Sequence, residues 1–360
     1  MRVLYDHQIF SSQKYGGVSK YFAEIINVLN KSVDIKISAW LSNNEYSKEY
    51  NLFRHTPFFP HSVFRGKGLL MEKLGIPYSL YEIYRGKYDI LHVTSYDDYC
   101  LKYLKNKPLI ITYHDTNFLT ERDYSAKRVK SQKKYVERAD KIVAVSQHTK
   151  EDMLKYFDIP EERVVVIHHG VSKTIIPESK NKRILPFEYI LYVGMRHGYK
   201  NFERFIKAFA LIKDKYPNVK VVCTRNAFSP NEISLFKELG LENRMEVFPA
   251  NEIDLACLYR DALFFIYPSI YEGFGMPILE AMINGCPTLL AKASCFPEIA
   301  QNAAEYFDPF NVDSIKEAMD LMLESQNLRK EVAERGVKHV KNFSWDICAQ
   351  KHLDLYKSLV

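Results

Sequence analysis

The sequence has few cysteines, and their spacing matches no metal site or disulfide framework. Its six cysteines are scattered, with no Cys-x-x-Cys pair and no His-rich tract beside them. This pattern argues against a structural zinc site and against a disulfide-stapled scaffold. Several lie in apolar runs, as Cys223 does in VKVVCT, which predicts reduced thiols in the core.

Long hydrophobic runs are also missing. No run approaches the roughly 18 apolar residues of a membrane-spanning helix. The opening residues, MRVLYDHQIF, lack the charged segment followed by an apolar one that marks a secretory signal peptide. No internal repeat and no low-complexity tract is evident. We therefore expect a cytoplasmic protein.

Two common nucleotide-binding motifs are absent as well. No Gly-x-Gly-x-x-Gly follows the first candidate strand, which disfavours a nicotinamide or flavin enzyme, and no P-loop sequence occurs. No nucleic-acid-binding module is recognisable, so we expect no nucleic-acid partner. The net charge of +6 fits phosphate-bearing substrates, an anionic membrane or simply a solvated basic face.

The chain is long enough for two domains, because 360 residues exceed the roughly 250 to 300 that one core supports. Short β-branched and aromatic runs alternate with amphipathic helical segments, which predicts parallel sheets. The predicted strands are residues 3–6, 34–39, 89–93, 109–113, 141–145, 164–168, 190–194, 219–224, 246–248, 263–267 and 288–291. The predicted helices are residues 18–29, 202–214, 231–239, 254–261, 277–284 and 297–302.

The domain boundaries follow from a loss of pattern. Residues 174–187 are polar and contain two prolines, which is typical of a linker. We predict an α/β protein with an N-terminal Rossmann-like domain of residues 1–173 and a C-terminal one of residues 188–344. Residues 345–360 are predicted to form a helix that crosses back to the first domain. The cleft between the domains is the expected ligand site.

The segment SIYEGFGMPILEA carries two glutamates eight residues apart. Gly273, Gly275 and Pro277 disfavour one continuous helix, so we place Glu272 on a loop and Glu280 one turn inside a helix that begins at the proline. Carboxylates are good acceptors for paired hydroxyls, so a ribose and a hexose would suit the two positions.

Backbone N–H groups of Phe274, Gly275 and Met276 would then point at a phosphate at the helix start. A glycine-rich turn with an acidic residue early in a helix explains the same residues without any ligand.

The segment YVGMRHGYKN places two cations after a strand. Arg196 and Lys200 lie on the loop that enters helix 202–214, where they can hold a diphosphate without a metal, and Asn201 is expected to cap the helix. Solvated surface cations are the alternative. Their position at the carboxyl end of a strand favours a ligand site.

Two places in the first half offer further candidates. Gly16 and Gly17 stand directly before helix 18–29, where they allow close approach of a ligand to the backbone. His114 follows strand 109–113 and can donate to a sugar hydroxyl, although a locally bonded loop histidine is the simpler alternative. The basic segment 127–141 is a candidate for contact with anionic lipid, with a solvated helix face as the alternative. The aromatic, basic segment 52–74 is expected to be partly core, and its exposed part is a candidate for holding an acceptor lipid or glycan.

Together these segments resemble a known family. EGFGMPILEA, YVGMRHGYKN, GGVSKYFAEI, VAVSQHTKED, HHGV and FPEIAQNAAEYFDPFN are similar to the retaining glycosyltransferases of family 4, which have the GT-B fold. The similarity runs from Gly16 to the tail. Two segments depart from the pattern: TRNAF stands where many relatives have a glycine-rich turn, and Gln301-Asn302 replaces the usual Gly-Asp.

The resemblance implies roles for the candidate residues. Glu280 would bind the nucleotide ribose, and Arg196 and Lys200 the diphosphate, assisted by the amides of residues 274–276. Gly16 and Gly17 would border the donor phosphate. The donor sugar would contact Glu272, Gly273, Phe274 and His114, with Glu272 and His114 as catalytic residues.

The resemblance also implies partners. The GYKNF variant is similar to bacterial mannosyl and rhamnosyl transferases of surface polysaccharide synthesis, which favours a GDP-linked manno-configured donor, with UDP-hexose as the alternative. The acceptor would be a glycan or lipid-linked saccharide, reached by peripheral contact at the inner face of the plasma membrane. No cofactor or metal is expected. A sugar-nucleotide epimerase, a phosphorylase and a non-catalytic sugar-binding protein remain alternatives at this point.

Overall fold

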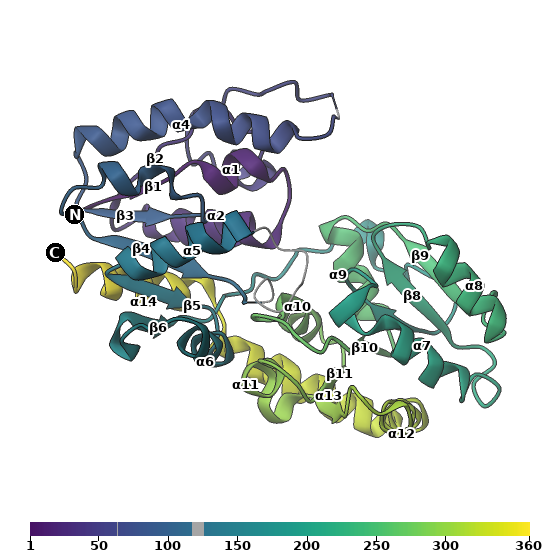
Figure 1. The fold of residues 1–360 in the computed structure, drawn as a ribbon. Coiled ribbons are helices and arrows are strands. Elements are labelled where there is room, and N and C mark those ends of the chain that lie inside the picture. Colours follow the sequence, from purple (N-terminus) through teal and green to yellow (C-terminus); the bar gives the residue numbers. More distant parts are fainter. Residues whose placement is uncertain (63, 117–125) are drawn as a thin grey trace. The chain divides into compact units, whose positions relative to one another are not determined.

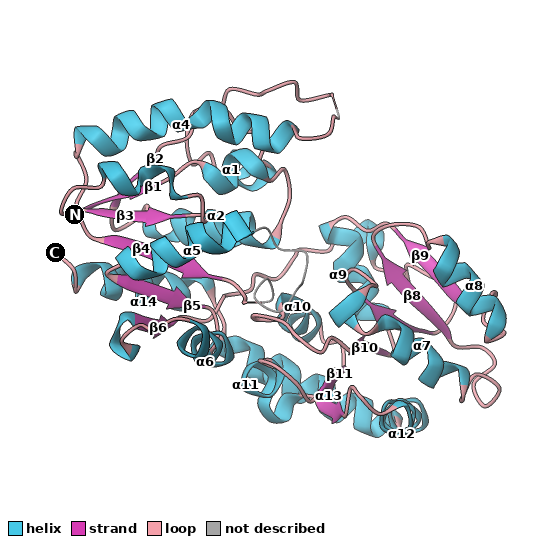
Figure 2. Ribbon diagram, in the orientation of Figure 1, coloured by secondary structure: helices cyan, strands magenta, loops and turns pink. Residues whose placement is uncertain are grey.

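The computed structural model describes residues 1–62, 64–116 and 126–360. The chain forms two compact units, which are described separately: unit 1 is Met1–Gly170 with Ser344–Val360, and unit 2 is Val171–Phe343. In each unit, helices cover both faces of one six-stranded parallel sheet (Figure 1, Figure 2). The predicted α/β class is therefore confirmed. Val63, within the aromatic segment 52–74, lies outside the described residues.

Unit 1 has the strand order β2-β1-β3-β4-β5-β6. Its strands are β1 (Arg2–Tyr5), β2 (Asp34–Ile37), β3 (Ile90–Val93), β4 (Leu109–Tyr113), β5 (Lys141–Ala144) and β6 (Val164–Val166). Its helices are α1 (Gln8–Ser12), α2 (Gly17–Leu29), α3 (Glu45–Glu49), α4 (Lys67–Arg85), α5 (Ala126–Arg138), α6 (Gln147–Tyr156) and α14 (Trp345–Lys357), with 3-10 turns η1 (Asp98–Tyr103) and η3 (Glu161–Arg163).

Unit 2 has the strand order β12-β11-β10-β7-β8-β9. Its strands are β7 (Tyr189–Tyr192), β8 (Lys220–Thr224), β9 (Met245–Phe248), β10 (Phe264–Tyr267), β11 (Thr288–Ala291) and β12 (Glu305–Phe307). Its helices are α7 (Phe202–Ala210), α8 (Pro230–Glu238), α9 (Glu252–Asp261), α10 (Met276–Ile283), α11 (Phe296–Ala300), α12 (Val312–Glu324) and α13 (Gln326–His339), with 3-10 turns η4 (Glu178–Lys180), η5 (Gly198–Lys200), η6 (Gln301–Ala303) and η7 (Val340–Asn342).

Every predicted strand is present, with ends that differ by a residue or two, but one strand was missed. Strand β12 is only three residues long and begins with a glutamate, so it has no apolar run to reveal it. Helix α7 ends at Ala210, four residues before the predicted end. The chain continues in tighter turns, with Ile212 N–H donating to the Phe209 carbonyl, and still buries Ile212. The apolar periodicity therefore continues beyond the last residue of the α-helix.

The segment predicted as a linker, residues 174–187, belongs to unit 2. The backbone N–H of Ile184 donates to the carboxylate of Asp261 at 2.8 Å, and Arg183 donates to the Asp261 carbonyl at 3.2 Å. Lys180 also pairs with Asp254. These contacts attach the polar segment to helix α9.

Helix α14, at the end of the chain, packs beside α2 in unit 1 (Figure 1). The Tyr356 hydroxyl shares hydrogen bonds with the Tyr5 hydroxyl at 2.6 Å and with His92 Nδ1 at 2.7 Å. His352 Nε2 shares a hydrogen bond of 2.9 Å with the Tyr21 hydroxyl. A side chain at Gly170 would overlap the backbone of Trp345, so the chain approaches α14 closely there. None of the described helices is both long and apolar enough to cross a membrane.

This packing buries His92, His169 and His352, and His114 lies partly buried beside His169. Protonation of any of the four opposes folding. Burial lowers the pKa of each, to about 4 for His352 and about 3 for His114. Below about pH 6.5 the unfolded chain therefore binds more protons at these sites than the folded chain does. The folded state consequently loses stability as the pH falls.

Replacing one of these histidines should flatten that dependence. His352→Gln should lower the slope of unfolding free energy against pH by about 1.4 kcal/mol per pH unit between about pH 6 and 5. Both tryptophans, Trp40 and Trp345, lie in unit 1, so tryptophan fluorescence in urea titrations reports this unit alone. His61→Gln, at an exposed histidine, is the control and should leave the slope unchanged. Equal slopes for all three proteins would contradict the assignment.

Candidate active site

The candidate site of unit 2 lies where the strand order changes direction. From β7 the sheet runs to β8 and β9 on one side and to β10, β11 and β12 on the other. In open α/β sheets, ligands bind outside the carboxyl ends of the strands at this switch point. Lys200 follows β7 and Glu272 follows β10, so the topology brings these two segments together. The Tyr199 carbonyl accepts a hydrogen bond of 2.8 Å from the backbone N–H of Ile270.

Lys200 and Glu272 form an ion pair in this position. Lys200 Nζ lies 2.5 Å from Glu272 Oε1, and the two side chains are only 10% and 14% exposed. The Tyr267 hydroxyl donates to the same oxygen at 2.7 Å. Oε2 of Glu272 makes no hydrogen bond to the residues that the structure describes. One oxygen is thus anchored twice, and the other is left for a ligand hydroxyl.

Tyr267 stays protonated in this arrangement. Burial and the neighbouring Glu272 carboxylate both raise the pKa of its hydroxyl well above the usual range. A protonated phenol can only orient the carboxylate by donating to it. Tyr267 is the last residue of β10. Arg196 and His114 were selected because they are polar groups near the carboxyl end of a strand, and the same criterion would have selected Tyr267.

The backbone of Glu272 is held by Ser294. The Ser294 hydroxyl donates to the Glu272 carbonyl at 2.6 Å and accepts from the Glu272 N–H at 3.1 Å. Ser294 has φ of 53°, a left-handed conformation that costs a non-glycine residue free energy. It lies just after β11, and no sequence pattern singled it out. The loop carrying Glu272 is therefore bonded at its side chain and its backbone.

Arg196 has a different set of partners. Its Nε donates to Glu232 Oε1 at 2.5 Å, and its Nη2 donates to the carbonyls of Asn226 and Ala227 at 3.0 and 2.9 Å. The guanidinium lies 4.9 Å from the ring centre of Phe228. Arg196 thus fastens the TRNAF segment, which departs from the family pattern, to the start of α8.

Glu232 is the acidic partner that sequence reasoning missed. Burial raises the pKa of its carboxyl, but hydrogen bonds from Arg196 and Ser229 outweigh this, so the net shift is downward. Ser229 and Glu232 form a capping box on α8, a pattern readable in the sequence as Ser-x-x-Glu before an apolar run. Burial raises the pKa of the Tyr192 hydroxyl well above its usual range; Glu272 adds to the rise and Arg196 opposes it.

Asn201 is the N-cap residue of α7, as predicted, but its side chain makes no capping hydrogen bond. It has the left-handed φ of 56°, and its side-chain amide donates to the carbonyls of Pro268 and Pro309 at 3.1 and 2.8 Å. These two hydrogen bonds join the Lys200 loop to the loop after β10 and to the chain after β12. Its role is therefore to fix the position of the neighbouring Lys200.

Helix α10 begins at Met276, with Pro277 as its second residue and Gly275 at the N-cap. Gly275 has φ of 85°, and a side chain there would press on Ile278 and Phe296, so glycine is required. Glu280 lies in the second turn, where the Tyr259 hydroxyl donates to its Oε2 at 3.3 Å. Phe274 is buried. The two glutamates are therefore on a loop and a helix, as their spacing predicted.

Unit 1 holds the remaining candidates. Gly16 is the N-cap of α2, and a side chain on it would collide with Gln13, whose side-chain oxygen accepts from the Ser19 N–H at 3.2 Å. A side chain on Gly17 would meet no atom within 4 Å. A side chain at Gly16 would thus displace the end of the Gln13 side chain, whereas one at Gly17 would enter open space.

His114 offers a neutral imidazole. Burial lowers its pKa to about 3, and its buried Nε2 has no hydrogen-bond partner among the described residues. Its ring lies edge-on to Tyr21 at 5.0 Å. A neutral histidine with one unoccupied nitrogen can exchange hydrogen bonds with a ligand hydroxyl.

Within the described parts of the chain, no three His, Cys, Asp or Glu side chains are grouped as metal ligands. All six cysteines are buried and unpaired. The site as described is composed of ion pairs, hydroxyls and backbone groups.

Comparison with known proteins covers almost the whole chain. Residues 15–174 match Glycosyltransferase Family 4, and residues 175–339 match the glycosyl transferases group 1. The chain is 30% identical over 270 residues to O-antigen chain mannosyltransferase B of Escherichia coli, which covers 69% of this chain and 70% of that protein. It is also 30% identical over 185 residues to O-antigen chain mannosyltransferase RfbU of Salmonella typhimurium, about half (51%) of each protein.

Solved structures share the fold. Sucrose-phosphate synthase from Thermosynechococcus elongatus superposes with a TM-score of 0.78 at 18% identity, over 100% of this chain and 99% of that one. Anabaena HepE in complex with UDP and glucose has a TM-score of 0.78 at 17% identity, over 99% and 100%. The predicted GT-B fold is confirmed by this agreement.

The Lys200–Glu272 pair should be strongly coupled. Lys200→Met leaves the buried Glu272 carboxylate without its counter-ion and should destabilise unit 2 by about 3 kcal/mol. Glu272→Gln leaves the ammonium unpaired in the same way, and the double variant should be much more stable than the two single effects add up to. Thermal unfolding followed by far-UV circular dichroism measures the cycle. Additive effects would show that the two groups do not interact.

Proposed function

We propose that this chain, which belongs to the family 4 glycosyltransferases, moves a manno-configured hexose from a GDP-linked donor to a hydroxyl of a glycan or lipid-linked saccharide, with retention of configuration. The observation that carries the proposal is the buried Lys200–Glu272 pair at the switch point of unit 2. The choice of sugar is supported by two relatives whose names are O-antigen mannosyltransferases.

The proposed step uses charge rather than a metal. The acceptor hydroxyl oxygen forms a bond to the anomeric carbon as the bond from that carbon to the diphosphate breaks. The electron pair leaves with the diphosphate, and the hydroxyl proton passes to a departing phosphate oxygen. Lys200 stabilises the charge that grows on the departing oxygens, because a preorganised ammonium in a site of low dielectric constant acts strongly there. Glu272, with one oxygen anchored by Lys200 and Tyr267, offers the other to the donor sugar beside the reacting carbon.

Other residues of unit 2 orient the nucleotide. Glu280 accepts from the ribose hydroxyls, and the backbone of residues 274–276 at the start of α10 faces the diphosphate. Arg196 needs to exchange its loop carbonyls for phosphate oxygens, or else it acts by holding the TRNAF segment in place. The proposal assigns no cofactor and no metal to the reaction.

In unit 1, the proposed roles fall to Gly16, Gly17 and His114. The glycines border the donor phosphate, and Nε2 of His114 contacts the sugar. We also propose that the acceptor is reached at the inner surface of a membrane.

The runner-up is a UDP-hexose-dependent transferase. Its support is that Anabaena HepE, of the same fold, binds UDP and glucose. Its donor would use the same phosphate and ribose contacts, so the base is what distinguishes the two candidates.

A nucleotide panel tests the donor. GDP and GDP-mannose should raise the melting temperature more than UDP and UDP-glucose, because the ligand that binds the folded state more tightly stabilises it more. A ligand at about 100 times its Kd stabilises the folded state by about 2.7 kcal/mol. Glu280→Gln should reduce the shift, and the exposed Glu324→Gln should not. The anomeric configuration of the product, read by NMR, tests retention. If neither GDP nor UDP shifts the melting temperature while an unrelated cofactor does, the proposed function is wrong.

Gly17 gives a separate test of unit 1. Gly17→Ala should raise stability by about 0.4–1 kcal/mol, since the added methyl group meets no protein atom. The transfer rate should nevertheless fall at least tenfold, because the methyl group occupies space assigned to the donor phosphate. Gly17→Ser should lower it further. Wild-type turnover in both variants would remove Gly17 from the site.

A further inference from the structure

Helix α4 carries an uncovered apolar stripe on its solvent side. Leu70, Leu74, Pro77, Tyr81 and Tyr84 follow the spacing i, i+4, i+7, i+11, i+14, which keeps them on one helix face. All five are exposed, with Leu70 and Tyr84 at 42% and 65%. We call these five residues the α4 stripe. In Figure 1, α4 runs along the outer edge of its unit.

The inward side of the same helix is small and polar by comparison. Gly75, Ser79 and Glu82 are buried there beside Met71 and Ile83. A surface helix usually turns its apolar face inward and its polar face to water. This helix buries Met71 and Ile83 but also carries a second apolar face toward water, and that outer face requires an explanation beyond the core of unit 1.

The loop before α4 extends the apolar surface. Phe59 and Phe64 are 60% and 43% exposed, and Leu69 is 57% exposed in the first turn of the helix. Arg65 is exposed between them. Aromatic and basic residues thus alternate from residue 59 into the helix.

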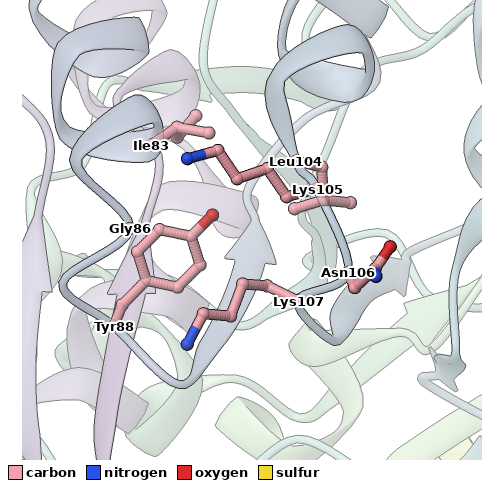
Figure 3. A pocket seen from close by; sticks show the side chains of 7 residues that line it. All are labelled: Ile83, Gly86, Tyr88, Leu104, Lys105, Asn106 and Lys107. Atoms are coloured by element: carbon pink, nitrogen blue, oxygen red, sulfur yellow. The ribbon is translucent and has the colours of Figure 1, made fainter.

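Cations lie against the rings at the other end of the stripe. The Arg85 guanidinium lies 5.4 Å from the ring centre of Tyr81, and Lys105 Nζ lies 5.0 Å from that of Tyr84. Beyond them is a cavity of about 350 Å³, whose lining includes Ile83, Tyr88, Lys105 and Lys107. Figure 3 shows Lys105 and Lys107 reaching past opposite sides of the Tyr88 ring.

No carboxylate of α4 lies on the stripe. Glu72 and Glu82 occupy other faces of the helix, and Glu82 is buried with Lys36 Nζ 2.7 Å from it. Arg85 lies 3.7 Å from the buried Glu82 carboxylate, and Lys134 and Arg138 of the basic helix α5 pair with Asp98 and Asp140. The exposed cations beside the stripe and the loop before it are Arg65, Lys73 and Lys105.

We propose that the α4 stripe lies on an anionic membrane surface. Leucine and tyrosine side chains enter the headgroup region, as is typical of interfacial helices and aromatic belts, and the surrounding cations meet anionic lipid. Lys105 and Lys107 take one anionic headgroup at the mouth of the cavity. Helix α4 carries Glu72, Lys73, Glu82 and Arg85 and is not apolar enough to cross a membrane, so it lies flat on the surface. The inference rests on the proposed function only for the membrane location of the acceptor.

The test is flotation of the full chain with lipid vesicles. Binding should be strong on phosphatidylcholine vesicles with about a third phosphatidylglycerol, weak on phosphatidylcholine alone, and reduced by salt. The triple variant Leu70→Ser, Leu74→Ser, Tyr81→Ser should lose at least tenfold in binding. Its matched control is Leu211→Ser, Leu321→Ser, Tyr156→Ser, at equally exposed positions outside α4, which should bind as wild type.

The lysines at the cavity are tested in the same way. Lys105→Gln with Lys107→Gln should reduce binding to anionic vesicles and its salt dependence, and Lys338→Gln with Lys341→Gln should not. GDP binding, measured in parallel, should be unchanged in every variant, so failure of the proposed function is seen separately. Wild-type protein that binds no vesicle, or a control variant that loses as much as the stripe variant, overturns the proposal. So does a dimer in light scattering that only the stripe variant dissociates.

Discussion

The arrangement of the loops at the candidate site of unit 2 depends on a buried lysine–glutamate pair at the end of a parallel sheet. Taking both charges out of water is costly, and the cost is met by a short contact, a phenol that donates to the same oxygen, and a serine that bonds the glutamate backbone. The surrounding loops are shaped around this pair. Asn201 adopts a left-handed conformation to join them, and Gly275 does so to start α10.

In the proposed reaction, this pair supplies the positive charge beside the diphosphate. In the described structure Lys200 already has a carboxylate partner, so an incoming diphosphate competes for an ammonium that is desolvated and oriented. Arg196, in contrast, is engaged with backbone carbonyls and Glu232. The two cations that look equivalent in the sequence therefore have different contacts: Lys200 pairs with Glu272, and Arg196 holds the TRNAF segment beside it.

Unit 1 has a polar network in its interior and an apolar surface on its exterior. The face of its sheet that packs on α2 and α14 is rich in buried histidine and tyrosine, joined by hydrogen bonds that fix the end of the chain. Helix α4 instead leaves leucine and tyrosine in contact with solvent. A polar interior and an apolar exterior both depart from the usual distribution of residues. The first holds helix α14 to unit 1, and the second is the surface that we propose to contact the membrane.

The sequence by itself determined the alternation of strands and helices, because buried parallel strands are continuous apolar runs, and it determined the loop-and-helix placement of Glu272 and Glu280, because glycine and proline restrict the local backbone. It missed β12, because a three-residue strand has too short an apolar pattern. It also missed the early end of α7, because the apolar spacing continues beyond the last α-helical hydrogen bond. Only the tertiary structure decided that Lys200 pairs with Glu272, that Tyr267, Ser294 and Glu232 complete the site, and that the apolar side of α4 faces outward. Those facts depend on which strands become neighbours and which helix face the core accepts, and neither is a property of any single segment.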